Sequence, residues 1–299
     1  MFLIKHRKLT YIISGTLVLL SILFVSWWGL KLGIDFTGGS FMEVEYQNTR
    51  PPMDEVKMNI ENAGIPHAAV QPTGERGFFI RTGHLTEDQH QVLLNAMRGD
   101  DKNEVLEKRF DAIGPTIGQE LKRKSVWAIG LVILLIVLYI AWAFRKVSEP
   151  VASWKYGVAT IIALVHDVMI PVGIFSILGH FYGVEVDTLF VTALLTILGF
   201  SVHDTIVVFD RIRENLKNSR SKSDFEMIVG SSISQTIVRS VNTSFTVLLV
   251  MLAIYFFGGS SISIFALTLI IGIFFGTYSS ICLASPILVT WQKWSGKRA

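Results

Sequence analysis

The sequence contains a single cysteine, Cys282, and this residue lies inside a long apolar run. An intramolecular disulfide and a cysteine-based metal cluster are therefore both excluded. Charged residues are also scarce, because Asp, Glu, Lys and Arg make up 17% of the chain, against about 25% in a typical soluble domain. No G-x-x-x-x-G-K-[ST] sequence occurs, so we do not expect a nucleotide-driven motor on this chain.

Most of the chain is apolar. Hydrophobic residues form 51% of it, and the mean hydropathy is +0.48. The net charge of +3 is too small to indicate a nucleic-acid partner, so we expect membrane lipid instead. A helix needs about 20 mainly apolar residues to cross the hydrocarbon core of a bilayer. Six stretches meet that length: Leu9–Leu30, Val126–Phe144, Val158–Leu178, Leu189–Phe209, Ile237–Phe257 and Ser263–Val289.

The distribution of Lys and Arg predicts the orientation of these spans. Residues 1–9 hold three such residues, 145–155 hold three, 211–222 hold five and 293–298 hold three, whereas the alternate loops 179–188 and 258–262 hold none. We therefore expect both termini in the cytoplasm and the long segment after the first span in the periplasm. The expected domains are 1–31 (N-terminus and first span), 32–124 (periplasmic) and 125–299 (the other five spans).

The periplasmic segment has the pattern of a small folded domain. Its polar and apolar residues predict the order β-α-β-β-α-β, typical of a ferredoxin-like α+β domain. The expected elements are Ser40–Tyr46, Met53–Ala63, Ala68–Gln71, Gly77–Thr82, a helix from Thr86 to Met97 opened by a capping box, and Glu104–Ile113. Residues 116–124 are expected to continue as a helix into the second span. A separate interfacial helix is expected at Ser223–Ser234, before the fifth span.

The expected periplasmic domain offers little chemistry. It has no paired Cys or His ligands and no nucleophile beside a base, so we expect neither an enzyme nor a cofactor. His84 and His90 lie in a polar stretch, where a surface position is favoured. The turn from Asp35 to Gly38-Gly39 contains glycines that permit positive φ or close approach of backbone, and either a hinge or a plain tight turn fits it.

Five ionisable residues fall within the expected spans. They are His166-Asp167 in the third, His203-Asp204 in the fourth, and Arg239 near the start of the fifth. Each charge in a span costs about 2.5–3.5 kcal/mol, so its presence needs a reason. At 1.5 Å per residue, Asp204 and Arg239 lie roughly 24 Å and 28 Å below the outer ends of their spans, and Asp167 roughly 17 Å. These depths predict that the three charges surround one polar seam.

Two stripes of polar and small residues accompany these charges. At helical spacing such stripes are expected to face the inside of a bundle, because lipid leaves their donors unpaired. The fourth-span stripe is Thr188, Thr192, Thr196, Gly199 and His203; the fifth-span stripe is Ser232, Gln235, Arg239, Asn242 and Thr246.

Three interpretations of these residues remain open. The Asp204–Arg239 pair could only fix helix register, or it could be a proton relay in which small movements change the charge of Asp204. His203 and His166 could take part or simply bridge helices. The same oxygen-rich stripes would also suit Na⁺. His203 and Asp204 are adjacent and point about 100° apart, so a metallohydrolase site is the least expected.

Three segments resemble the SecD/SecF family of bacterial protein-export subunits. They are Gly33-Ile-Asp-Phe-Thr-Gly-Gly39, the long fourth-span motif from Gly199 to Asn215, and the stretch from Gln235 to Ser244. Because a second six-span half is lacking, the resemblance indicates a separate SecF-type subunit. The implied fold is one RND-like half of a twelve-span unit, in the bacterial cytoplasmic membrane.

The resemblance also implies partners and roles. The implied partners are SecD, the SecYEG channel and a translocating preprotein. The implied function is the use of the proton-motive force in late steps of translocation, with Asp204 binding and releasing protons and Arg239 as its partner. Two alternatives remain: half of an RND exporter for small molecules, which predicts a large pocket in the periplasmic domain, and an assembly subunit that transports nothing.

Overall fold

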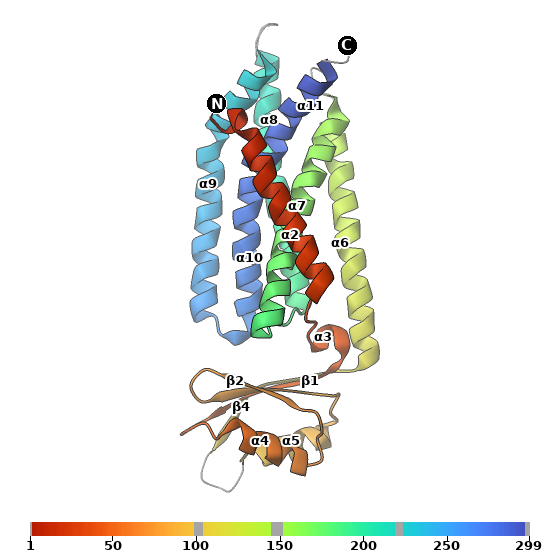
Figure 1. The fold of residues 1–299 in the computed structure, drawn as a ribbon, viewed down its shortest axis with the longest axis vertical. Helices are drawn as coiled ribbons and strands as arrows, with labels where there is room; N and C mark the ends of the chain where they lie inside the picture. Colours follow the sequence, from red (N-terminus) through yellow and green to blue (C-terminus); the bar gives the residue numbers. More distant parts are fainter. Residues whose placement is uncertain (1, 99–103, 145–151, 219–223, 297–299) are drawn as a thin grey trace. The chain divides into compact units, whose positions relative to one another are not determined.

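The computed structural model describes residues 2–98, 104–144, 152–218 and 224–296. The chain divides into two compact units, one of Met1–Lys31 with Val126–Ala299 and one of Leu32–Ser125 (Figure 1). These boundaries differ from the predicted ones by at most one residue. Six of the basic residues that predict the orientation of the spans lie outside the described residues: Arg145, Lys146, Arg220, Lys222, Lys297 and Arg298.

Six helices are long and apolar enough to cross a membrane, and each of the six predicted spans falls on one of them. They are α2 (Arg7–Trp28), α6 (Pro115–Ala143), α7 (Ser153–Tyr182), α8 (Thr188–Asn218), α9 (Phe225–Phe257) and a composite of α10 (Ser260–Ser279), the π-helix η1 (Ser280–Ala284) and α11 (Ser285–Gly296). The short helices α1 (Phe2–Lys5) and α3 (Ile34–Thr37) flank the first span. Residues 225–234, expected as an interfacial helix before the fifth span, are helical but continue into that span without a break as α9.

The core of the six-helix unit lies where α7, α8 and the sixth span meet. Tyr156, Leu164, Phe209 and Ile281 are among its buried residues. Close approach of α10 to α8 depends on Gly272, since a Cβ there would overlap the side chain of Ile197. The backbone separation is thus set by a residue without a side chain, as is common between membrane helices.

The second unit confirms the ferredoxin-like prediction. Its strands β1 (Gly39–Tyr46), β2 (Ala69–Thr73), β3 (Gly77–Thr82) and β4 (Val105–Ile113) form an antiparallel sheet in the order β2-β3-β1-β4. Helices α4 (Met53–Asn62) and α5 (Glu87–Arg98) cover one face of the sheet (Figure 1). The capping box of α5 is formed, with Thr86 N donating to Gln89 Oε1 at 3.0 Å. The helix beyond residue 115 is also confirmed, because α6 runs unbroken from Pro115 into the second span.

Candidate functional site

Two aspartates lie buried inside the six-helix unit. Asp167 on α7 is fully buried, and Asp204 on α8 is 7% exposed. The sequence predicts both as ion-coupling or supporting residues, and the structure places both on the interior faces of their helices.

Asp167 accepts hydrogen bonds from two other helices. The Ser201 hydroxyl of α8 donates to Asp167 Oδ2, and the Ser279 hydroxyl of α10 donates to the same oxygen at 2.7 Å. His166 Nδ1 lies 2.8 Å from Asp167 Oδ1. His166 therefore supports this carboxylate, as the sequence allowed.

Asp204 is also held by hydroxyl groups. The Ser240 hydroxyl of α9 donates to Asp204 Oδ1, and the Ser280 hydroxyl, at the start of η1, donates to Asp204 Oδ2 at 2.5 Å. Three helical elements thus converge on this carboxylate. Both of its partners are neutral, so the carboxylate has directed donors but no counter-charge from them.

Arg239 does not share the predicted seam. Its side chain is exposed, and within the described part of the chain it forms no ion pair with Asp204. The reason is the helical repeat: successive residues point about 100° apart, and Ser240 is the residue that faces Asp204. Arg239 instead lines a cavity of about 530 Å³ between α8 and α9, together with Ile206, Val207, Asp210, Arg211, Glu214, Gln235 and Thr236.

Gln235 is likewise engaged elsewhere than at Asp204. Its Oε1 accepts from Arg211 Nε at 2.5 Å and from Asn215 Nδ2 at 3.0 Å. Asn215 also donates to Ser232 Oγ at 2.8 Å. Gln235 therefore ties α9 to the charged end of α8, and its predicted support of Asp204 is wrong for this conformation.

The two polar stripes face away from the six-helix unit, which corrects the prediction that they point into it. The exposed residues are Thr192, Thr196, Gly199 and His203 on α8 with Gln235, Arg239, Asn242 and Thr246 on α9; Ser232 alone of the two stripes is fully buried. The Thr196 hydroxyl donates within its own helix, to Thr192 O at 2.8 Å. We call these eight exposed residues the outer polar face.

The serines that donate to the two aspartates are not among the predicted site residues. Ser201 lies three residues before Asp204 on α8, and Ser240 directly follows Arg239. Ser279 and Ser280 form a polar pair inside the last apolar stretch. That pair was the available signal, because two consecutive hydroxyls have no use on a lipid-facing surface.

The turn from Asp35 to Gly39 requires its glycines. Gly38 has φ +73°, and a Cβ on it would lie 2.7 Å from Pro115 Cα at the start of α6. Gly39 has φ +133°, and a Cβ there would lie 2.8 Å from Thr82 O. Both predicted requirements, positive φ and close approach, are met at these two positions, and the turn joins the start of β1 to the base of α6.

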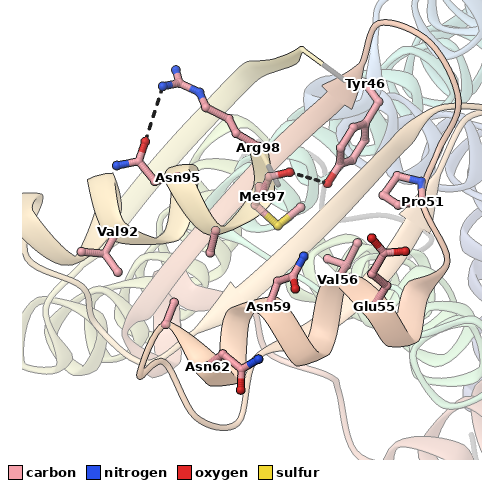
Figure 2. A pocket seen from close by; sticks show the side chains of 12 residues that line it. Tyr46, Pro51, Glu55, Val56, Asn59, Asn62, Val92, Asn95, Met97 and Arg98 are labelled. Atoms are coloured by element: carbon pink, nitrogen blue, oxygen red, sulfur yellow. Dashed lines mark hydrogen bonds between the residues drawn. The ribbon is translucent and has the colours of Figure 1, made fainter. Parts of the chain in front are cut away.

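The second unit contains a groove of about 580 Å³ between α4 and α5 (Figure 2). Its lining is Tyr46, Pro51, Glu55, Val56, Asn59, Asn62, Ala63, Val92, Asn95, Ala96, Met97 and Arg98. Three carboxamides (Asn59, Asn62 and Asn95) share this lining with the charged side chains of Glu55 and Arg98 and with apolar side chains such as Val56 and Val92. The groove therefore offers both hydrogen-bonding and apolar contacts.

One histidine of this unit differs from its prediction. His90 is 7% exposed, where a surface position was expected. Its Nδ1 lies 3.2 Å from Glu87 Oε1 and its Nε2 lies 3.0 Å from Glu107 Oε2. The ring stacks on Phe110 with centroids 3.7 Å apart, so His90 connects α5 to the edge strand β4. His84 is exposed as predicted.

Comparison with known proteins agrees with this architecture. The family model described as protein export membrane protein SecD/SecF, C-terminal, matches residues 93–294, and the SecD/SecF GG motif matches residues 29–49. The chain is 44% identical to the protein translocase subunit SecF of Thermobaculum terrenum, over 97% of this chain and 93% of the relative. The chain belongs to the SecF family. A second SecF, from Anaerolinea thermophila, is 41% identical over 97% of this chain and 94% of the relative.

Two solved SecDF structures resemble this SecF-family chain. One is SecDF of Thermus thermophilus, described as a translocon-associated membrane protein, with a TM-score of 0.83 and 34% identity. The other is SecDF in a super-membrane-facing form, with a TM-score of 0.69 and 33% identity. The chain is covered almost fully in both, but spans only 38% and 39% of the SecDF chains. Family membership gives the chain a role in protein export and a place in the bacterial inner membrane.

Proposed function

We propose that this chain, together with SecD, uses the proton-motive force to promote late steps of protein translocation across the cytoplasmic membrane. The observation that carries the proposal is Asp204, a buried carboxylate within a span whose two hydrogen-bond donors are both neutral hydroxyls. An ionised carboxylate is costly at such a place, and binding a proton removes the charge. The proposed role of Asp204 is therefore to alternate between an ionised carboxylate and a protonated carboxyl.

Arg239 supplies a way to change the state of Asp204. It directly follows Val238 and precedes Ser240, which faces the carboxylate. Rotation of α9 by about 100° would exchange the serine for the arginine, because that is the angle between successive residues of a helix. A guanidinium beside the carboxylate favours the ionised form, so the rotation would expel the proton. The Asp204–Arg239 pair is thus proposed as a second state of the site.

SecD is the proposed partner at the outer polar face. Hydroxyl, carboxamide and guanidinium groups on a membrane-spanning surface need partners that lipid cannot supply. The face includes Arg239 and Asn242 on α9 and Thr196 on α8, all exposed in this chain. A second six-helix half would cover it, as the SecDF name of the similar structures suggests.

The remaining partners and the ion follow from the same proposal. SecYEG and a translocating preprotein are the proposed partners, and the export assay below requires both. No enzymatic activity and no cofactor are proposed, because the gradient itself would supply the energy. Na⁺ is the alternative ion, since serine and carboxylate oxygens also bind hard cations. An imposed Na⁺ gradient would restore export in place of a collapsed proton gradient only if Na⁺ is the ion.

Replacement of Asp204 by Asn tests the proposal. Asn has a similar size but cannot ionise, so we expect Asp204→Asn to abolish the gradient-dependent part of export. The ATP-driven part, which the SecA ATPase powers, should stay intact. The measurement is export of a secreted reporter by the assembled complex, with and without a protonophore, at matched membrane abundance. Asp88→Asn provides the matched control, because Asp88 is an exposed carboxylate at the start of α5.

Either outcome of this comparison is informative. Loss of the protonophore-sensitive part in Asp204→Asn but not in Asp88→Asn supports proton coupling through Asp204. Full gradient dependence in Asp204→Asn contradicts it, and would make the chain an assembly subunit whose buried aspartates only fix the packing of helices.

A further inference from the structure

A second carboxylate, Asp167, lies in the six-helix unit, and the proposed function does not use it. It is fully buried on α7, where Ser201 of α8 and Ser279 of α10 donate to it. Ionisable residues inside membrane spans are costly and are commonly functional. Like Asp204, Asp167 is a buried carboxylate that accepts hydrogen bonds from serine hydroxyls of two other helical elements.

Two consecutive serines connect the two carboxylates. Ser279 Oγ donates to Asp167 Oδ2 at 2.7 Å, and Ser280 Oγ donates to Asp204 Oδ2 at 2.5 Å. The serines occupy the junction at which α10 gives way to the π-helix η1. Short π-helical turns inside membrane or soluble helices are rare and frequently lie at functional sites.

Each serine also has a second acceptor in the preceding turn. Ser279 Oγ lies 3.0 Å from Gly276 O, and Ser280 Oγ lies 3.0 Å from Thr277 O. A hydroxyl has one proton, so it donates fully to the carboxylate or to the carbonyl but not to both. An ionised carboxylate can only accept a hydrogen bond, so the hydroxyl donates to it, whereas a protonated carboxyl can itself donate to the serine oxygen. The serine then donates to the carbonyl, so the bonding of this turn follows the protonation of the carboxylate.

His166 contacts Asp167 through one ring nitrogen. His166 Nδ1 lies 2.8 Å from Asp167 Oδ1, while Nε2 is buried and has no hydrogen-bond partner among the described residues. In the tautomer that donates from Nδ1, a second proton on Nε2 would be a buried donor without an acceptor, which is unfavourable.

The other elements packed around Asp167 bring hydroxyl groups. α8 brings Ser201 and α10 brings Ser279. Tyr278 of α10 faces the His166 ring, with centroids 6.0 Å apart. α2 contacts α7 through Ser21, at Gly173. Among these groups His166 and Tyr278 can titrate, and only His166 contacts the Asp167 carboxylate.

We infer that Asp167 is a second proton-binding site, coupled to Asp204 through Ser279, Ser280 and the π-helical turn that they open. A proton that binds either carboxylate redirects a hydroxyl of this turn and so changes the donor geometry offered to the other carboxylate. Such coupling is reciprocal by linkage. The inference rests on the proposed function only in taking Asp204 as a residue that binds protons.

Infrared difference spectroscopy against pH tests this inference without an export assay. The sample is the full chain in lipid nanodiscs, where a protonated carboxyl and a carboxylate absorb at different frequencies. Asp167→Asn and Asp204→Asn assign one carboxyl band each. We expect both bands to titrate in the unsubstituted chain. In Asp204→Asn, the midpoint of the Asp167 band should move by at least fivefold in proton concentration. Fivefold is the lower end of the change in affinity that coupled sites usually show.

Two further variants separate coupling from a general disturbance. Ser279→Ala removes the hydroxyl of the serine pair that donates to Asp167 but keeps both carboxylates and Ser280. We expect Asp204→Asn then to leave the Asp167 midpoint within twofold. Thr268→Val is the control on the same helix and should leave the coupling intact. Among the described residues, the Thr268 hydroxyl donates only to Ile264 O, at 2.7 Å. An Asp167 band that does not respond to pH, or one with the same midpoint in Asp204→Asn, overturns the inference. Either result is independent of whether Asp204→Asn loses gradient-dependent export.

Discussion

Both buried aspartates, Asp167 and Asp204, accept hydrogen bonds from serine hydroxyls. Residues next to Asp204 and to its partner Ser240 in the sequence lie on the exposed surface instead. Asp204 faces inward and His203, one residue earlier, is exposed; Ser240 faces inward and Arg239 is exposed. The angle of about 100° between successive residues places members of one sequence motif on different surfaces. A motif that is continuous in sequence is therefore divided between an internal site and an external face.

Tyr46 gives a prediction at the same scale in the second unit. Its hydroxyl donates to Met97 O at 3.0 Å, and burial raises the pKa of Tyr46 to about 12, above the usual value of about 10. A group whose pKa is raised on folding stabilises the protein below the unfolded pKa, so this contribution is complete below about pH 10 and is lost as the pH rises through 12.

A tyrosinate absorbance titration of the full chain measures this pKa. The difference between the unsubstituted chain and Tyr46→Phe is expected to have its midpoint near 12. The same substitution leaves Met97 O without its donor, which should cost about 1 kcal/mol of stability at neutral pH. A difference titration centred near 10 would contradict the buried hydrogen bond.

At the scale of elements, the turn at Gly38-Gly39 and the sixth span both depart from regular structure where other elements contact them. The turn brings the start of β1 against the base of α6, and both glycines have positive φ. The sixth span changes from α to π conformation at Ser280, where it contacts Asp204. The first lies in the segment matched by the SecD/SecF GG motif, and the second lies at the serine that contacts Asp204.

Gly38→Ala is expected to loosen the contact between this turn and α6. Ala is strained by about 1–2 kcal/mol at positive φ, and its Cβ would lie 2.7 Å from Pro115 Cα. Hydrogen exchange of the full chain should therefore rise about fivefold or more in peptides covering residues 34–39 and 114–119. Gly83→Ala is the control, because a Cβ at Gly83 meets nothing within 4 Å. Equal exchange in the two variants would show that the close approach of Gly38 to Pro115 does not stabilise this turn.

At the scale of the whole molecule, the outer polar face indicates an incomplete membrane surface. Polar groups of α8 and α9 are exposed along a helix pair that must cross lipid. Asp204 lies on α8 and accepts a hydrogen bond from Ser240 of α9, while Asp167 on α7 accepts one from Ser201 of α8. A partner that covers the face would therefore also control access of water and ions to Asp204.

Photo-crosslinking tests this arrangement in cells. A benzoylphenylalanine placed at Asn242, on the outer polar face, is expected to capture SecD. The matched control is the same residue at Leu20 on α2, which is 42% exposed and apolar, and which should capture SecD much less. Equal capture at both positions, or none at Asn242, would show that SecD does not cover the outer polar face.

The six spans, the ferredoxin-like order of the second unit and the backbone requirements of Gly38 and Gly39 could all be predicted from the sequence. Span length, alternation of apolar residues and positive φ are local properties, so neighbouring residues are enough to predict them. Three outcomes depended on packing in three dimensions: Ser240 rather than Arg239 contacts Asp204, His90 is buried, and the polar stripes face outward. These outcomes depend on the rotation of each helix about its axis, which is set by packing between segments far apart in sequence: an error of one residue turns a helix face by about 100°.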